Sequence, residues 1–320
     1  MPVSRNRRKN KKRSPLTLVK KAGPAPMADQ KPLPPLPHRR AMEGIMAKLT
    51  GGLFAEDSFG DAGEGEDALR RAQELMYDAW DAGTKRERIA LAKQALEISD
   101  LCADAHVLLA EEAAKNTIEA RRHYEAGVAA GEKALGAETF EQNVGHFWGI
   151  LETRPYMRAR AGLAECLWEQ GERDGAIAHL QDMLRLNPGD NQGLRHILAG
   201  WLLAVHDHEA LEKLIEAYDD DAFAEWAYSK TLLAFRLHGP SPQAKAALKT
   251  AWSRNAFVPD LLIGARKIPR RVADYFGLGS KEEAALYVLT NKENWSATEG
   301  ALQWLHDATR NLPPPTKKHR

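Results

Sequence analysis

The sequence predicts an all-α protein, an α-solenoid built from antiparallel helix hairpins. Three observations support this fold class. From about Ala68 to Ala308 the chain is rich in Ala, Leu, Glu, Lys and Arg, and its apolar residues recur at a spacing near 3.6. The same stretch has few β-branched runs and shows no strand pattern. Residues of similar size also return every 34 positions, which is typical of stacked helical repeats.

Residues 1–40 are expected to be a disordered, basic and proline-rich arm. The arm holds twelve Lys/Arg and one acid, Asp29, so the other 280 residues, with 33 Lys/Arg and 43 Asp/Glu, carry a net charge of −10. Such a charged stretch with few large apolar residues cannot build a core. Its PxxPxR spacing at 34–39 fits a polyproline ligand for an aromatic groove, or a semi-rigid linker. A start at Met27 would omit the basic segment.

The remaining regions follow from changes in composition. Residues 41–66 are expected to form a short helix and then an acidic, glycine-rich linker, GDAGEGED at 60–67. The repeat array is expected to span residues 67–256 and a helical cap to span 257–310. A disordered tail is expected at 311–320.

The repeat is clearest over three successive units. A pair of antiparallel helices cannot bury its apolar faces alone, so each unit must pack on the next. A small residue lets the two helices approach closely, and a large one a turn later fills the space between them. Glycine suits the left-handed turn between the helices, where the middle unit has His206-Asp207-His208 instead. The repeated positions are Ala176, Ala210 and Ala244, then Leu180, Leu214 and Leu248, and the turn glycines Gly171 and Gly239.

These units resemble the tetratricopeptide repeat. The resemblance implies a right-handed solenoid of about five hairpins, in which two looser units at 72–98 and 106–135 precede the regular ones. Arg160 occupies the tryptophan position of the motif, and Leu180 replaces an aromatic residue. The residues that match the motif spacing are Leu163, Ala164, Leu167, Gly171, Ala176 and Pro188.

The C-terminal part resembles a second family. The segments are NAFVPDLLIGARKIP at 255–269, GSKEEAALYVLTNKENW at 279–295 and EGALQWL at 299–305. They are similar to the end of the suppression-of-tumorigenicity protein 7 family, whose members carry a VPxxLL segment after a repeat array. This resemblance implies a helical scaffold and does not imply an enzyme. Eukaryotic members begin with membrane-spanning segments, and this sequence has no comparable apolar stretch.

The repeat register also predicts a peptide-binding groove. The concave wall of such an array is lined by first-helix residues that do not pack against neighbours. Arginine and tryptophan suit this wall because they offer large contact areas and planar donors. The alternative for Trp168 and Trp226 is that they belong to the core of adjacent helices. The predicted groove residues are Arg158, Glu165, Trp168, Glu169, Gln192, Arg195, Trp226 and Ser229.

The basic arm supplies an alternative function, that of a nucleic-acid- or ribosome-associated protein. The arm would attract phosphates nonspecifically, and this attraction should fall steeply with salt. Aromatic residues are not interleaved with the basic ones, so base stacking is not expected. The arm could instead be a solubilising tail or dock on the acidic body. Its phosphate-seeking residues are Arg5, Arg7, Arg8, Lys9, Lys11, Lys12 and Arg13.

The sequence predicts no catalytic, cofactor or metal site. It contains none of the motifs G-x-x-x-x-G-K-[ST], H-E-x-x-H and G-x-S-x-G. His206-Asp207-His208 has no further ligands nearby in the sequence and is expected to be a solvated turn. Residues 277–281 are expected to form a turn in which Ser280 caps the next helix.

Residues 145–160, GHFWGILETRPYMRAR, form the densest cluster of aromatic, basic and histidine side chains. Such a cluster could be an active site, but the repeat register predicts a joint between the looser and the regular hairpins. Thr153 is expected to cap the helix that begins there, with Pro155 in its first turn. The apolar residues Phe147 and Trp148 are expected to close the seam.

Composition limits the class of protein. The 320 residues are 43% hydrophobic and 28% charged, which is typical of a globular chain. No stretch reaches the roughly 18–20 apolar residues of a membrane span, and residues 1–15 lack the apolar run of a secretory signal. Cys102 and Cys166 are too few for a disulfide framework. We therefore expect a cytoplasmic, non-catalytic scaffold without cofactors, which binds a protein or peptide partner and no membrane.

Overall fold

The computed structural model describes residues 40, 42–44, 46, 64–269, 276–310 and 312, all within one compact unit, His38–Arg320. Within these residues the chain is helical and contains no strand, which confirms the predicted all-α class. The predictions for the basic arm, its PxxPxR spacing and the C-terminal tail concern residues outside this described part, apart from Arg40 and Leu312.

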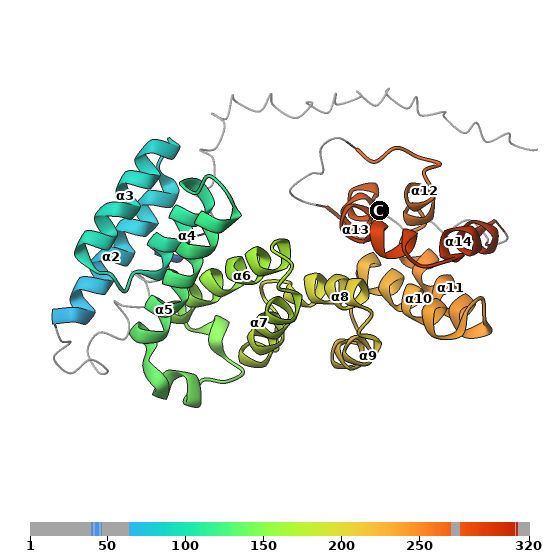
Figure 1. The fold of residues 1–320 in the computed structure, drawn as a ribbon, viewed down its shortest axis with the longest axis horizontal. Coiled ribbons are helices and arrows are strands. Elements are labelled where there is room, and N and C mark those ends of the chain that lie inside the picture. Colours follow the sequence, from blue (N-terminus) through green and yellow to red (C-terminus); the bar gives the residue numbers. More distant parts are fainter. Residues whose placement is uncertain are drawn as a thin grey trace, which may run out of the picture. The chain divides into compact units, whose positions relative to one another are not determined.

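Consecutive helices pack as neighbouring pairs, as expected for a helical repeat (Figure 1). Five pairs follow one another in the described part, joined by short turns. They are α2 (Glu64–Asp81) with α3 (Lys85–Ile98), α4 (Ala103–Glu112) with α5 (Thr117–Gln142), α6 (Arg154–Glu169) with α7 (Arg173–Leu186), α8 (Leu194–Val205) with α9 (His208–Ala217), and α10 (Ala224–His238) with α11 (Pro242–Arg254). Three helices follow: α12 (Val258–Leu262), α13 (Lys281–Ser296) and α14 (Ala301–Thr309).

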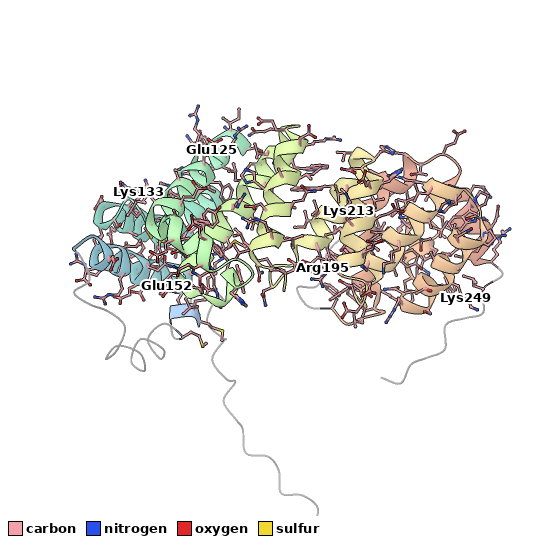
Figure 2. All side chains as sticks on the ribbon, turned by 90° about the horizontal axis from the view of Figure 1, so that it is seen from below. Glu125, Lys133, Glu152, Arg195, Lys213 and Lys249 are labelled. Carbon is pink, nitrogen blue, oxygen red and sulfur yellow. The ribbon has the colours of Figure 1, made fainter. Side chains whose placement is uncertain are left out.

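The second helices of the pairs carry charged side chains outward. Figure 2 labels Glu125 and Lys133 on α5, Lys213 on α9 and Lys249 on α11, and all four are exposed. The opposite faces of the same helices contribute leucines and alanines to the core. Helices α9 and α11 are therefore amphipathic, which is why their apolar residues recur with the helical period.

The repeated positions pack as predicted in two of the three regular units. Ala176 and Ala244 are fully buried between the helices of their pairs, and the leucines four residues later are buried with them. The middle unit is looser, since Ala210 is only half-buried. Helix α9 is short, and its alanine therefore does not draw the pair as closely together.

The turns between helices have the predicted left-handed backbone. Gly171 and Gly239 have φ angles of 85° and 63°. His206 takes the same role in the middle unit with φ of 60°, an uncommon conformation for a residue with a Cβ atom. The next residue, Asp207, caps α9 by accepting a hydrogen bond from the Ala210 amide at 3.0 Å.

Glycines bring α5 and α6 into unusually close contact. A Cβ atom added at Gly162 would overlap the ring of Tyr124, and one added at Gly131 would lie 2.8 Å from the Tyr156 Cβ atom. These two positions therefore require glycine for packing reasons. Helix α5 also kinks at Gly136, where φ is 69°, next to the end of the looser unit predicted from the sequence.

The 145–160 segment is a joint, as predicted. It forms two 3₁₀ turns, η1 (Phe147–Gly149) and η2 (Leu151–Thr153), ahead of α6. The fully buried Phe147 ring packs against Phe140 and Tyr156, with centroid distances of 5.1 and 6.3 Å. Trp148 is only half-buried, and the guanidinium carbon of Arg154 lies 5.3 Å from the centroid of the Trp148 ring.

Two local predictions were wrong. Thr153 does not cap α6, because its backbone is already helical and its hydroxyl donates to the carbonyl oxygens of Phe147 and Ile150. A capping side chain needs an extended backbone to reach the amides of the first turn. The acidic linker predicted at 60–67 also ends earlier, since α2 begins at Glu64. Acidic residues are favoured there because they face the positive end of the helix dipole.

Replacing Phe147 with alanine should lower the free energy of unfolding by about 3–5 kcal/mol, because the ring fills the joint and leaves a cavity. Trp148→Ala is the matched control and should cost about 1 kcal/mol, since that ring is half-exposed. Urea denaturation followed by circular dichroism measures both. Equal losses would contradict this assignment of the buried ring.

Candidate peptide-binding surface

The first helices of the five pairs, α2, α4, α6, α8 and α10, form what we call the first-helix side. Two segments of the chain itself pack on it. One is the docked segment, which we define as the described residues 40, 42–44 and 46. Of these, 42–44 and 46 are helical. The other is α13, which packs against α8 and α10. The surface predicted to bind a partner is therefore partly covered by its own chain.

The docked segment is held through the carboxylate of Glu43. Its two oxygens accept hydrogen bonds from Arg158 Nη1 at 2.9 and 3.1 Å, and one of them pairs with Arg154 Nη1 at 3.3 Å. The two arginines come from the same face of α6, four residues apart. Only 12% of the Glu43 side chain is exposed, so this ion pair is largely shielded from solvent.

Arg158 is anchored from the other side by Asp104 of α4. Its Nε and Nη2 atoms donate to the two oxygens of Asp104 at 2.8 and 2.5 Å, and Gln73 donates a further hydrogen bond at 2.8 Å. Burial alone would lower the pKa of Arg158, but Asp104 and Glu43 raise it, so the guanidinium stays charged. Asp104 is completely buried and depends on this partner.

The other charged contact of the docked segment is made by Arg40. Its guanidinium forms a bidentate pair with Glu111 of α4, with both distances 2.8 Å, and lies 5.2 Å from the Trp80 ring centroid. Gly44 lies against Tyr77, where an added Cβ atom would overlap the ring at 2.7 Å. Arg40, Glu43 and Gly44 of the segment therefore each contact a complementary side chain on the first-helix side.

Helix α13 is also held by polar side chains. Asn294 Nδ2 donates to the Gly200 carbonyl of α8 at 3.1 Å, and Asn291 Nδ2 lies 3.4 Å from Glu225 Oε1 of α10. Ser280 caps the helix as predicted, by accepting from the Glu283 amide at 3.1 Å. The Glu283 carboxylate in turn accepts from the Ala224 amide at the start of α10, at 2.9 Å.

Arg236 ties three helices together at their C-terminal ends. From α10 it donates to the Leu203 carbonyl of α8 at 2.5 Å, the Asn294 carbonyl of α13 at 3.0 Å and the Thr298 hydroxyl at 2.9 Å. The last carbonyls of a helix lack partners within it and carry partial negative charge. Burial lowers the pKa of Arg236, and these three oxygens accept the hydrogen bonds that its guanidinium donates.

The structure corrects the placement of three predicted groove residues. Arg158 is buried in the ion pairs described above, and Ser229 is fully buried. Trp226 is 1% exposed, with the rings of His196 and Tyr218 at 5.7 and 6.3 Å, so the alternative that it belongs to the core was correct. Arg158 is covered by the docked segment, whereas Trp226 is enclosed by side chains of the array itself.

Arg195, labelled in Figure 2, is only partly accessible. Its Nη1 atom donates to Asp190 at 2.9 Å and its Nε atom to Asp221 at 2.7 Å. Its charge is therefore satisfied within the array. Gln192, three residues earlier, is half-buried, and its Oε1 atom is buried without a hydrogen-bond partner among the described residues.

The remaining predicted groove residues lie on α6 and are accessible. Glu165 and Glu169 are exposed, and Trp168 is half-buried with its ring stacked on Trp201 at a centroid distance of 4.5 Å. Burial of part of its surface, followed by the charges of Glu169 and Glu111, raises the pKa of Glu165. This part of the first-helix side is thus acidic and flanked by a tryptophan pair.

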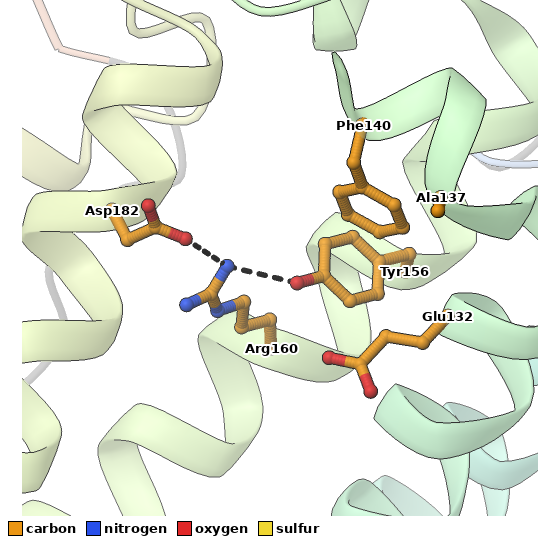
Figure 3. Close-up of a pocket in the computed structure, with 6 residues that line it drawn as sticks. All are labelled: Glu132, Ala137, Phe140, Tyr156, Arg160 and Asp182. Atoms are coloured by element: carbon orange, nitrogen blue, oxygen red, sulfur yellow. Dashed lines mark hydrogen bonds and ion pairs between the residues drawn. The ribbon is translucent and has the colours of Figure 1, made fainter.

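An open pocket of about 410 Å³ lies between α5, α6 and α7 (Figure 3). Arg160 donates to the Tyr156 hydroxyl at 2.8 Å and to Asp182 at 2.5 Å, as the dashed lines show. Glu132 and Phe140 also line it. Because the arginine is already paired with a carboxylate, the pocket offers no unpaired cation for an anionic ligand.

A larger groove of about 660 Å³ lies between α7 and α9 with α8 beneath it. It exists because α9 packs loosely on its pair. The floor is formed by Leu198 and Leu202, and the rim carries charges of both signs, including Lys213 and Glu209. Sequence reasoning missed this groove, although the short second helix of the middle unit was a usable sign of it.

The described residues include no cluster of three or more His, Cys, Asp or Glu that could hold a metal ion. His206 and His208 lie 6.0 Å apart between ring centroids at the turn. Burial raises the pKa values of the Cys102 and Cys166 thiols to about 12 and about 11. Among the described helices, none is both long and apolar enough to cross a membrane.

Sequence reasoning missed Asp104, Glu111, Trp80 and Glu43. One sign was available for Asp104, which stands in the apolar run ADAHVLLA at the start of α4. A carboxylate buried in such a run needs a buried cation as its partner. The position of that cation, 54 residues further along the chain, could not be found without the fold.

Arg158→Met should lower the free energy of unfolding by about 3–5 kcal/mol, because it leaves Asp104 buried without its charge partner. The double variant Arg158→Met/Asp104→Leu should recover at least half of that loss, since it removes both charges. Arg185→Met, at an exposed ion pair with Asp182, is the control and should change stability little. A double variant no more stable than the single one would contradict this account.

Glu225→Gln should change the pH dependence of stability. Burial raises the pKa of Glu225 to about 7, with smaller upward contributions from Asp221 and Glu283, while the Asn291 hydrogen bond opposes the shift. The folded state therefore holds a proton that the unfolded state has lost, so this group costs stability as the pH rises from 4.5 towards 7. The glutamine variant should gain on the order of 3 kcal/mol over wild type above that range.

Urea midpoints measured at several pH values check this. His196, whose pKa is lowered by burial, costs stability as the pH falls. Because its Nδ1 atom lies 3.8 Å from Glu225 Oε2, the comparison is made with His196→Gln in both proteins. Glu209→Gln, at an exposed pair with Lys213, is the control. A constant difference between Glu225→Gln and wild type across the range would contradict the raised pKa.

The chain has relatives of similar sequence. A sequence model of the family described as "ST7 protein" matches residues 63–319. "Suppressor of tumorigenicity 7 protein-like" is 26% identical over 278 residues, covering 79% of this chain, in Gallus gallus and in Homo sapiens, with 50% and 48% of those proteins covered. "Protein ST7 homolog" of Drosophila melanogaster is 25% identical over 281 residues, covering 79% of this chain and 52% of that protein.

The chain thus spans about half the length of the curated relatives it matches. The family model covers α2 to α14, including every helix of the first-helix side, and it begins after the docked segment. The resemblance drawn from the three C-terminal segments is confirmed, and the chain belongs to the ST7 protein family.

Proposed function

We propose that this protein is a non-catalytic cytoplasmic scaffold that binds a peptide segment of a partner protein. In this proposal the array is a right-handed, tetratricopeptide-like solenoid, and the partner binds on its first-helix side. One observation supports the proposal above the others. That side already binds two separate segments of the chain itself, the docked segment and α13, through side chains of the first helices.

The mode of recognition follows from these contacts. A carboxylate is held between Arg154 and Arg158, and a guanidinium is held between Glu111 and the Trp80 ring. Charge-assisted bidentate contacts of this kind specify geometry as well as charge. Such a surface selects peptides by the pattern of their side chains and does not require a long apolar anchor.

Charge on the first-helix side favours a peptide over nucleic acid. Arg154, Arg158 and Arg195 are all paired with carboxylates, and Glu165 and Glu169 add exposed negative charge. A phosphate backbone needs a run of cations without such partners. Association with nucleic acid through the basic arm remains a separate prediction, because residues 5–13 lie outside the described part.

Selection from a library of displayed peptides tests the proposal. We expect peptides that bind the chain carrying Arg40→Ala/Glu43→Ala, in which the docked segment no longer occupies these contacts. Binding should be at least about 10-fold weaker when Glu111→Gln and Arg154→Gln are added, since each removes one charge contact. Lys213→Gln/Lys249→Gln, on second helices, is the control and should leave binding unchanged. Fluorescence anisotropy with labelled peptides measures the affinities.

Two results would contradict the proposal. One is that no peptide is enriched on wild type or on a chain carrying Arg40→Ala/Glu43→Ala. The other is that enriched peptides lose binding with the second-helix control variant and not with the first-helix variant.

A further inference from the structure

We propose that the docked segment is a ligand in cis, and that its receptor on α2, α4 and α6 takes an equivalent segment from another protein. That segment would present arginine and, three residues later, glutamate followed by glycine, as Arg40, Glu43 and Gly44 do. This inference rests on the proposed function, since it names the partner class for part of the first-helix side.

The receptor is built without help from the docked segment. Arg158 keeps its bidentate pair with Asp104, and Gln73 keeps its hydrogen bond to the same carboxylate. Trp80 belongs to the core cluster of α2, α3 and α4. The groups that contact the ligand are therefore already positioned when the segment leaves, which lowers the cost of binding a replacement.

The receptor recognises three features of its ligand: a carboxylate, a guanidinium and a position without a side chain. Arg154 and Arg158 take a carboxylate, and Glu111 with Trp80 takes a guanidinium. On a helix, residues three apart lie on one face, so both charges reach the receptor together. Close contact with Tyr77 leaves no space for a side chain at the following position, which selects glycine.

The contacts described above for the docked segment are mainly charged. Met42 and Met46 are 45% and 52% exposed, whereas the Glu43 side chain is only 12% exposed. When the segment leaves, Arg154 on α6 loses its carboxylate partner. A second ligand with the same pattern of charges restores that ion pair. Exchange with a competitor is therefore balanced in charge.

Ligand and receptor are separate parts of the chain. The receptor residues lie within 63–319, the region matched by the family model, and the docked segment precedes it. Residues 47–63, outside the described part, connect the two. Linkage in one chain gives the segment an effective concentration on the order of 1 mM. For a segment whose own Kd is about 0.1 mM or lower, a competitor in solution should therefore bind wild type at least about 10-fold more weakly than an open receptor.

The test uses a labelled synthetic peptide, HRRAMEGIMAK, with the sequence of residues 38–48. Its receptor is the full chain carrying Arg40→Ala/Glu43→Ala, compared with wild type. We expect the peptide to bind the variant at least about 10-fold more tightly. Adding Glu111→Gln/Arg154→Gln should abolish binding. A peptide with its arginine at position 40 and glutamate at position 43 exchanged should not bind, and one with leucine in place of Gly44 should bind more weakly.

Circular dichroism and melting curves establish that each variant is folded. The inference is overturned if the peptide fails to bind the folded Arg40→Ala/Glu43→Ala chain, if it binds that chain and wild type equally, or if the charge-exchanged peptide binds as well. A wild-type dimer that becomes monomeric in that variant would also overturn it, because the segment would then be exchanged between copies. Selected peptides that bind elsewhere on the first-helix side would leave the proposed function standing.

Discussion

A helix hairpin in this array buries one apolar face between its own two helices and needs neighbours to bury the rest. Stacking satisfies most of that need, with alanine and leucine alternating at the contact between paired helices. The first-helix side remains, and the chain covers it with parts of itself. Helix α13 lies over α8 and α10, and the docked segment lies over α4 and α6. These two covers decide which parts of the first-helix side stay accessible.

Polar contacts fix the position of both covers, and α13 also buries Tyr287, Val288 and Trp295 in the core. Arg236 donates hydrogen bonds to carbonyl oxygens near the ends of α8 and α13. Arg158 forms ion pairs with both α4 and the docked segment. Buried ion pairs of this kind add little net stability, because desolvation offsets their attraction, but they penalise any other placement of their partners. The array thus uses leucine and alanine to stay folded and arginine to define where the covering segments lie.

Much of the fold could be predicted because helical period and turn chemistry are local. Gly171, Gly239 and Ser280 each took the role that their sequence context indicated. Thr153 did not, because its hydroxyl found carbonyl partners in the joint. The site was harder to predict. The partners of Arg158 lie 54 and 115 residues away, and a repeat register places a residue on a face without showing what the rest of the chain lays over it.

The docked segment also sets where the N-terminal forty residues are attached. While Arg40 is paired with Glu111, everything before it is anchored at α4. Once the whole docked segment leaves its receptor, the next described part of the chain is the start of α2 at Glu64, and the chain from Arg40 to Glu64 can span at most roughly 80 Å. A competitor at the receptor would therefore move the point at which the positively charged N-terminal residues are attached, from α4 to the start of α2.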